Sequence, residues 1–176
     1  MLVDIVAVES DEEVILHNLI EKYEYELTQY FDHDVNELGL YGFDYFDSFF
    51  HENAKRWVFF IKVDGKLAGF AMILADYFYL KSRKADYTLA DFFVMHKYRG
   101  RGVGTFAARY LFAKFKGVWQ LNTFDKNTAA VGFWLKVIRD YTEGAYEILP
   151  NEEPEEEFGP GDEKWRHKVF LFSSTQ

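Results

Sequence analysis

The residues best suited to chemistry form one run in the middle of the chain, residues 91–104. Its apolar first part reads as a strand, and every second residue of its last part is glycine, at positions 100, 102 and 104, before a helical pattern begins. Glycines let a ligand approach the backbone closely, and the first amide N–H groups of a helix have no partner within the helix. The run therefore predicts an anion site suited to phosphate or pyrophosphate.

Several kinds of nucleotide site use such glycines, and the spacing decides between them. A P-loop needs lysine and then serine or threonine after its last glycine, whereas Gly104 is followed directly by Thr105. A dinucleotide fingerprint needs Gly-x-Gly-x-x-Gly early in the chain and an acidic residue on the next strand. This run lies in mid-chain and is spaced Arg-x-x-Gly-x-Gly. A turn that only starts a helix is the remaining alternative.

The spacing resembles motif A of the GNAT superfamily of acetyl-CoA-dependent N-acetyltransferases. Asp-Phe-Phe-Val-Met followed by Tyr-Arg-Gly resembles its polyamine acetyltransferase branch in particular. The resemblance implies that acetyl-CoA is the acetyl donor, held at the pantetheine arm by the strand and at the pyrophosphate by the turn. The residues it assigns to the cofactor are Phe92, Phe93 and Val94 on the strand, and Arg99, Gly100, Arg101, Gly102, Val103 and Gly104 on the turn.

Residues 127–134 resemble the second half of the family signature, Asn-x-x-Ala-x-x-x-Tyr, with one departure. Trp134 stands where the family has tyrosine, and it is assigned to cofactor binding together with Asn127. In many members this tyrosine is the presumed general acid for the departing thiolate. An indole N–H donates a hydrogen bond but cannot usefully release its proton. The residues that follow resemble predicted acetyltransferases of undefined acceptor.

The same resemblance suggests where the acceptor amine binds and loses its proton. Polyamine enzymes carry Glu-Asp before Phe-Phe-Val, whereas this chain has Ala90-Asp91, which leaves Asp91 as the candidate catalytic group, with a surface strand carboxylate as the alternative. Acceptor recognition in the fold usually falls to the first helices and their loop. Tyr25, Tyr30 and Asp32 are therefore predicted to bind the substrate through charge pairing and cation–π contacts, with core rings and solvent-facing carboxylates as the alternative.

Composition limits the other possibilities. The 176 residues are enough for a single domain, and a formal net charge of −9 argues against a nucleic-acid partner. The absence of cysteine is compatible with a reducing cytoplasm, and no apolar run is long enough to span a membrane. The five histidines lack metal-ligand spacing, so no metal is expected. Because dimers are frequent in the superfamily, a cytoplasmic homodimer is the prediction.

Periodicity and turn signals give the expected order of elements, β-α-α-β-β-β-α-β-α-β-β, with Asp64-Gly65 as a hairpin turn. Strands are predicted at 2–8, 57–63, 67–74, 87–95, 118–124, 141–149 and 168–172, and helices at 10–30, 44–53, 102–115 and 127–138. This order is that of the GNAT fold, an α/β (α+β) domain over 1–176 with a mixed sheet that splays at motif A. The acidic segment 150–163 is predicted to be a mobile loop within that domain.

The resemblance thus implies transfer of an acetyl group from acetyl-CoA to a primary amine of a small molecule or a protein, by direct attack in a ternary complex. The alternative is a non-catalytic acyl-CoA-binding module, which Trp134 in the tyrosine position and Ala90 favour.

Overall fold

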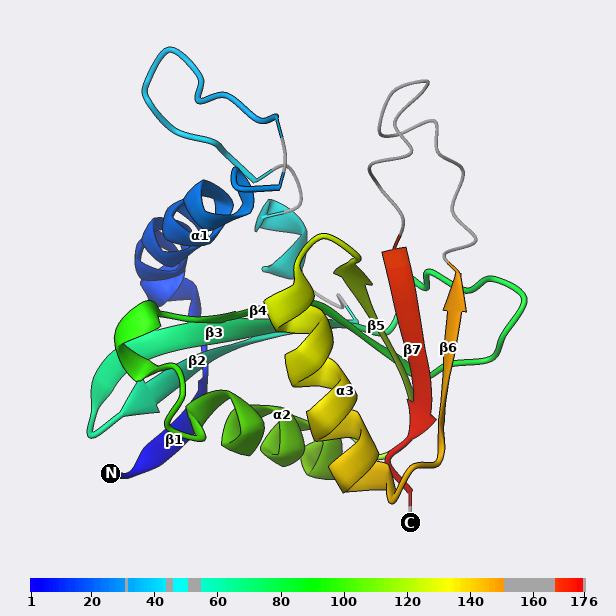
Figure 1. Ribbon diagram of the computed structural model, residues 1–176. Coiled ribbons are helices and arrows are strands. Elements are labelled where there is room, and N and C mark those ends of the chain that lie inside the picture. The colour runs from blue at the N-terminus through cyan, green and yellow to red at the C-terminus, as the bar shows by residue number, and fades with distance from the viewer. Residues whose placement is uncertain (31, 44–45, 51–54, 151–166, 176) are drawn as a thin grey trace. The chain divides into compact units, whose positions relative to one another are not determined.

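A computed structural model describes residues 1–30, 32–43, 46–50, 55–150 and 167–175 of the chain (Figure 1). Its contacts group into two compact units. Unit 1 comprises Met1–Met72 and Asp91–Gly104, and unit 2 comprises Ile73–Ala90 and Thr105–Gln176. The prediction of a single domain over 1–176 stays a prediction. No helix among the described residues is both long and apolar enough to cross a bilayer.

The described elements are three α-helices, three 3₁₀ turns and seven strands. The helices are α1 (Glu13–Leu27), α2 (Val103–Lys114) and α3 (Thr128–Thr142), and the turns are η1 (Ser10–Glu12), η2 (Phe46–Phe49) and η3 (His96–Tyr98). The strands are β1 (Val3–Ala7), β2 (Arg56–Val63), β3 (Lys66–Leu74), β4 (Tyr87–Val94), β5 (Val118–Phe124), β6 (Tyr146–Pro150) and β7 (His167–Ser173), in the sheet order β1-β2-β3-β4-β5-β7-β6. The pair β4–β5 is parallel, whereas β1–β2, β5–β7 and β6–β7 are antiparallel. This mixed α/β architecture confirms the predicted fold.

Unit 1 is organised by the packing of α1 on β3 and β4. Leu16 and Ile20 are buried on the apolar stripe of α1. One turn further along, the Tyr23 ring contacts the Phe70 ring of β3 at 5.6 Å and the Phe93 ring of β4 at 5.7 Å between centroids. These aromatic contacts bury large apolar areas and fix which side of α1 faces the sheet. They therefore determine which α1 side chains can reach the end of β4.

Gly69 on β3 allows the end of β4 to approach closely. A Cβ atom at this position would lie 1.9 Å from the carbonyl oxygen of Phe93, a backbone atom that no rotamer change can move away. Beside it, the Met95 amide donates to the Ala68 carbonyl at 2.8 Å. The backbone geometry of residues 93–95 therefore depends on the absence of a side chain at position 69.

We expect Gly69→Ala to lower the free energy of unfolding by about 2 kcal/mol or more, because the strands must separate to admit the methyl group. Urea denaturation measures the change. Gly132→Ala on α3 is the matched control, since its Cβ would meet nothing within 4 Å. Alanine there should stabilise the helix by about 0.5–1 kcal/mol. If Gly69→Ala unfolds at the same urea concentration as the wild type, the close approach of the two backbones is refuted.

Unit 2 has its core around Phe112 of α2. This fully buried ring lies 5.1 Å from the Trp119 ring of β5, 4.9 Å from the Phe172 ring of β7 and 5.4 Å from the Tyr141 ring of α3. β5 pairs with β7 along its whole length, from Val118↔Ser173 to Phe124↔His167. The segments before and after residues 151–166 are thus brought into one sheet.

Three predictions of element bounds differ from the structure. The strand expected at 141–149 begins only at Tyr146, because α3 runs past Ile138 to Thr142 and ends in a left-handed Glu143 (φ 54°). The helix expected at 44–53 is the four-residue turn η2 within the described part, residues 46–50, and the rest of that range lies outside the described residues. Of the acidic segment 150–163, Pro150 pairs with Lys168 as part of β6, and 151–163 lie outside the described residues. A proline can close β6 because β6 is an edge strand.

Candidate active site

The glycine turn after β4 has the backbone that an anion site requires. Gly100 (φ 70°) and Gly102 (φ 82°) are both left-handed, and a Cβ at either position would meet nothing within 4 Å. The turn is exposed, whereas the next residue, Val103, is fully buried and anchors the start of α2. Open space, left-handed glycines and a helix start occur together, which is the combination that accommodates a phosphate. The turn therefore fits the pyrophosphate of acetyl-CoA.

The strand residues assigned to the cofactor alternate between core and partial exposure. Phe93 is 3% exposed and belongs to the core under α1, and Phe92 is partly buried on the opposite side of the strand. Val94 is buried at the end of β4, and its carbonyl oxygen accepts a 2.5 Å hydrogen bond from Nε of Arg99. The Phe93 side chain is thus committed to packing, which leaves the backbone of the strand for any contact with a pantetheine arm.

Two carboxyl groups of unit 1 have pKa values far above the ordinary range. Burial raises the pKa of Asp91 to about 6, and a hydrogen bond from Tyr23 partly offsets the rise. Burial, followed by the charges of Asp91 and Glu21, raises the pKa of Glu24 to about 7. The Glu24 side chain is only 13% exposed, and Nδ1 of His33 lies 3.8 Å from its Oε2. A carboxyl group with a pKa near neutrality can take and release protons at physiological pH.

The raised pKa of Glu24 has a consequence for stability. Glu24 binds its proton more tightly in the folded state than in the unfolded state, because its pKa is about 7 in the former and 4.5 in the latter. The free energy of unfolding therefore falls as the pH rises from 4.5 to about 7. We therefore expect Glu24→Gln to be more stable than the wild type by about 2 kcal/mol at pH 8, and by much less at pH 4.5. Urea denaturation across this range measures the difference.

The control for this substitution is Glu37→Gln, which removes a carboxylate from an exposed loop position. It should give the same difference from the wild type at both pH values. A stabilisation by Glu24→Gln that grows as the solution is acidified would contradict the burial and repulsion described above.

A pocket of about 750 Å³ in unit 1 lies between α1, the loop at residues 39–41 and residues 93–97. Its lining includes three aromatic rings and two carboxylates, those of Tyr25, Tyr41, Phe93, Glu21 and Glu26. The Glu21 carboxylate accepts hydrogen bonds from the amides of Tyr41 and Gly42 at 2.9 and 3.0 Å. It thereby fixes the loop that closes one side of the pocket.

The three residues predicted to bind the substrate differ in whether they line this pocket. Tyr25 is 67% exposed and lines the pocket. Tyr30 and Asp32 follow the end of α1 and are not among the lining residues. Asp32 is exposed, and Tyr30 is partly buried with its amide bonded to the Leu27 carbonyl at 2.8 Å. The pocket therefore supports a substrate role for Tyr25 more than for the other two.

The predicted cofactor residues of unit 2 have evident structural roles. Asn127 caps α3, where its Oδ1 accepts from the Ala130 amide at 3.0 Å. Trp134 is 6% exposed, and its ring lies 4.7 Å from the Phe133 ring in an edge-on arrangement. Their assignment to the cofactor stays a prediction. Among the residues that the structure describes, no three histidine or carboxylate side chains gather as metal ligands.

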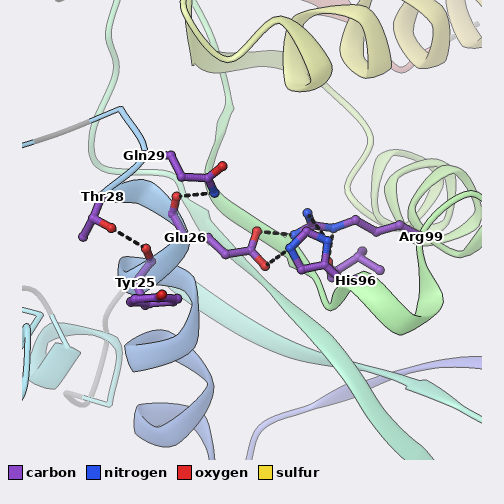
Figure 2. A network of polar contacts seen from close by, with 7 residues as sticks. Tyr25, Glu26, Thr28, Gln29, His96 and Arg99 are labelled. Atoms are coloured by element: carbon purple, nitrogen blue, oxygen red, sulfur yellow. Dashed lines mark hydrogen bonds and ion pairs between the residues drawn. The ribbon is translucent and has the colours of Figure 1, made fainter.

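The structure adds site residues that the motifs did not include, Glu24 and Glu26 above all. Glu26 binds Arg99 and His96, as Figure 2 shows. Glu24 had a signal in the sequence, because it lies four residues after Ile20 and beside Tyr23 on the apolar stripe of α1. A carboxylate on a buried stripe is costly unless it has a purpose or a partner.

Comparison with known proteins agrees with this geometry. The sequence pattern of the Acetyltransferase (GNAT) family matches residues 16–138. No curated protein sequence matches the chain. Similar solved structures include a GNAT acetyltransferase from Streptococcus agalactiae 2603, with 19% identity, a TM-score of 0.66 and coverage of 99% of this chain and 96% of that one.

Two further structures contain ligands. Spermidine N-acetyltransferase from Vibrio cholerae, in complex with CoA and spermine, is 14% identical with a TM-score of 0.60 and covers 98% of this chain and 96% of its own. Arabidopsis thaliana Naa50, in complex with the bisubstrate analogue CoA-Ac-MVNAL, is 15% identical with a TM-score of 0.61. The match covers 98% of this chain and 99% of Naa50. These likenesses concern the fold, and the family match spans more than half of the sequence. The chain therefore belongs to the GNAT family of acetyltransferases and is an N-acetyltransferase that takes its acetyl group from acetyl-CoA.

Proposed function

We propose that the enzyme transfers the acetyl group directly to a primary amine within a ternary complex, and that Asp91 receives the proton that the amine must lose. The observation that carries this proposal is the position of Asp91 on β4, two residues before the pocket-lining Phe93, where its buried carboxyl group accepts a hydrogen bond from Tyr23 of α1. Burial raises its pKa to about 6, and its charge contributes to the raised pKa of Glu24. Both groups exchange protons near neutrality, where an amine acceptor must be deprotonated before it can attack.

Acetyl transfer forms a carbon–nitrogen bond, breaks a carbon–sulfur bond and moves protons. Acetyl-CoA supplies an activated carbonyl carbon, to which the amine nitrogen bonds as the carbon–sulfur bond breaks and CoA leaves as a thiol. An ammonium acceptor loses two protons overall. The Asp91 carboxylate, which accepts a hydrogen bond from Tyr23, takes the first and passes it to solvent, and the second goes to the departing thiolate. Alignment of the two substrates supplies much of the remaining acceleration, which a buried Trp134 in place of tyrosine does not remove.

The pocket beside α1 supports a cationic acceptor. The Tyr25 and Tyr41 rings can interact with an ammonium group through their faces. The same lining contains the Glu21 and Glu26 carboxylates together with Lys22 and Lys97, so an ammonium group would pair with individual carboxylates and not with a net negative charge. The Vibrio cholerae enzyme is in complex with the polyamine spermine, and Arabidopsis thaliana Naa50 with a peptide-based bisubstrate analogue. Small-molecule and protein amines are therefore both acceptor candidates for this chain.

The proposal is tested by titrating the protein with acetyl-CoA in a calorimeter and then measuring thiol release with spermidine and with a peptide carrying a free N-terminus. We expect binding, turnover with at least one amine class, and a kcat/KM that rises as the pH passes through about 6 to 7. Binding without any turnover across a wider amine panel would favour the acyl-CoA-binding module that Trp134 suggests. Absence of binding would overturn the proposal.

A further inference from the structure

Three charged or polar side chains join the last turn of α1 to the segment after β4. Glu26 lies on α1, and His96 and Arg99 lie at the start and just past the end of η3 (Figure 2). Oε2 of Glu26 is 2.5 Å from a terminal nitrogen of Arg99, and its Oε1 is 3.1 Å from Nε2 of His96. The other terminal nitrogen of Arg99 is 3.3 Å from Nδ1 of His96. We call this set the α1 clamp.

The guanidinium of Arg99 contacts the protein through each of its three nitrogens, although the side chain is 41% exposed. Its Nε donates to the Val94 carbonyl at 2.5 Å, and its two terminal nitrogens reach Glu26 and His96. Its central carbon also lies 5.8 Å from the centre of the Phe93 ring. All three nitrogens thus have partners at the end of β4 or on α1. Each terminal nitrogen keeps one further N–H group, so a phosphate at this fork would have to share the guanidinium with Glu26 and His96.

The clamp determines the proton position on His96. A guanidinium can only donate hydrogen bonds, so Nδ1 of His96 must accept one, and its proton then resides on Nε2. The Nε2–H group in turn points at the carboxylate of Glu26. With this tautomer the contacts among the three side chains form a closed ring, an arrangement in which hydrogen bonds strengthen one another.

Arg101 lacks the contacts that Arg99 makes with the end of β4 and with α1. It lies between the two left-handed glycines, its side chain is exposed, and it makes no hydrogen bond or ion pair with the described residues. An unpaired guanidinium beside open backbone amides is well placed for charge-assisted bonds to a phosphate. The two arginines of the turn are therefore unequal.

The clamp also reaches the acceptor pocket, because Glu26 and His96 both line it. The last turn of α1 is closed by its own side chains, with the Thr28 hydroxyl bonded to the Tyr25 carbonyl at 2.7 Å and the Gln29 amide to the Glu26 carbonyl at 3.0 Å (Figure 2). Exposed single ion pairs contribute little. The Glu26 side chain, however, is 20% exposed and shared by two partners.

We propose that Arg99 is a positioning residue, which together with Glu26 and His96 holds the pocket-lining turn of α1 against the start of the glycine turn and leaves phosphate charge pairing to Arg101 and the backbone. The inference rests on the proposed function, in which the glycine turn binds acetyl-CoA and the pocket binds the amine. It reverses the role that motif resemblance assigns to Arg99.

The test compares three clamp variants, Arg99→Gln, Glu26→Gln and the double variant, with Arg101→Gln. Calorimetry should show that each clamp variant binds acetyl-CoA within about threefold of the wild-type affinity. The affinity of Arg101→Gln should be lower than that of the wild type by about tenfold or more, and it should depend less steeply on salt. Amide hydrogen exchange of residues 25–30 should be faster in Arg99→Gln and Glu26→Gln by about tenfold, with no further increase in the double variant. With spermidine as the probe amine, the first two variants should raise the KM for the amine more than they lower kcat.

Arg99→Lys separates charge from geometry, because lysine keeps the charge but cannot bridge Val94, Glu26 and His96 at once. The clamp predicts that amide hydrogen exchange of residues 25–30 is as fast in Arg99→Lys as in Arg99→Gln, and faster than in the wild type. The inference is overturned if Arg99→Gln weakens acetyl-CoA binding as much as Arg101→Gln does while Glu26→Gln has no effect, or if exchange is unchanged in both clamp variants. A wild type that fails to bind acetyl-CoA would refute the proposed function instead, and the exchange measurements would still decide the clamp.

Discussion

We expect Gly102→Asp to abolish detectable binding of acetyl-CoA, with a loss of affinity of about 100-fold or more. Two effects add in this variant. The backbone at Gly102 has φ 82°, which an L-residue adopts only at a cost, and the new carboxylate would stand where the turn receives a phosphate. Because a Cβ there meets nothing within 4 Å, the loss does not come from a clash within the protein. Calorimetric titration measures the affinity.

Gly65→Asp is the matched control for this experiment. Gly65 has φ 75° in the β2–β3 hairpin, and a Cβ there also meets nothing within 4 Å, but no helix begins after it. This variant carries the same backbone strain and the same charge, and it should bind acetyl-CoA as the wild type does. Gly102→Ala carries the strain alone and should lose far less affinity. If Gly102→Asp binds acetyl-CoA normally, the phosphate does not bind at this turn.

Asp91→Asn lowers kcat by about 100-fold or more, in the range expected when a general base is removed. The amide has the size of the carboxyl group but cannot accept the proton of an ammonium. The rise of the rate with pH through about 6, where the Asp91 carboxyl group ionises in the free protein, should also disappear. Steady-state rates from pH 5.5 to 9 with the amine that turns over test both statements.

Asp91→Asn should keep the fold, so a lower rate would report on catalysis. Burial disfavours the charged form of Asp91, so the neutral amide should not reduce stability at pH 8. Urea denaturation verifies that condition, and Asp34→Asn, at an exposed loop position, controls for removal of an acidic charge. A variant with Asn at position 91 that keeps the wild-type rate and pH profile would remove Asp91 from the mechanism and leave Glu24 as the group to test.

The parts of the fold that local chemistry determines were predictable from the sequence. Asp64-Gly65 between two apolar runs predicted the hairpin, and both residues have the positive φ values that its turn requires (49° and 75°). The glycine turn after β4 was predictable for the same reason. The end of α3 was not, because Thr142, which favours strands by propensity, is 1% exposed in the helix and bonds its hydroxyl to the Ile138 carbonyl at 2.8 Å. Tertiary burial outweighed propensity there.

The candidate site shows the same division. Asp91 and the glycines lie in one contiguous run, so a motif could indicate them. Glu26 and Arg99 are 73 positions apart in the sequence, and their contact depends on how α1 packs on β3 and β4. Motif resemblance assigned Arg99 to the phosphate because a linear pattern carries no information about which side chain is already bound to another element. The pocket is likewise assembled from three separate segments.

The way the chain passes between its two units limits how the enzyme can be dissected. It changes unit after Met72, after Ala90 and after Gly104, and the second of these points falls inside β4, next to Asp91. No single cut between residues 72 and 105 therefore yields two fragments that each contain a complete unit. Split reporters, truncated variants for crystallisation and domain exchanges with other family members would all have to carry β4 whole, together with the residues on both sides of it.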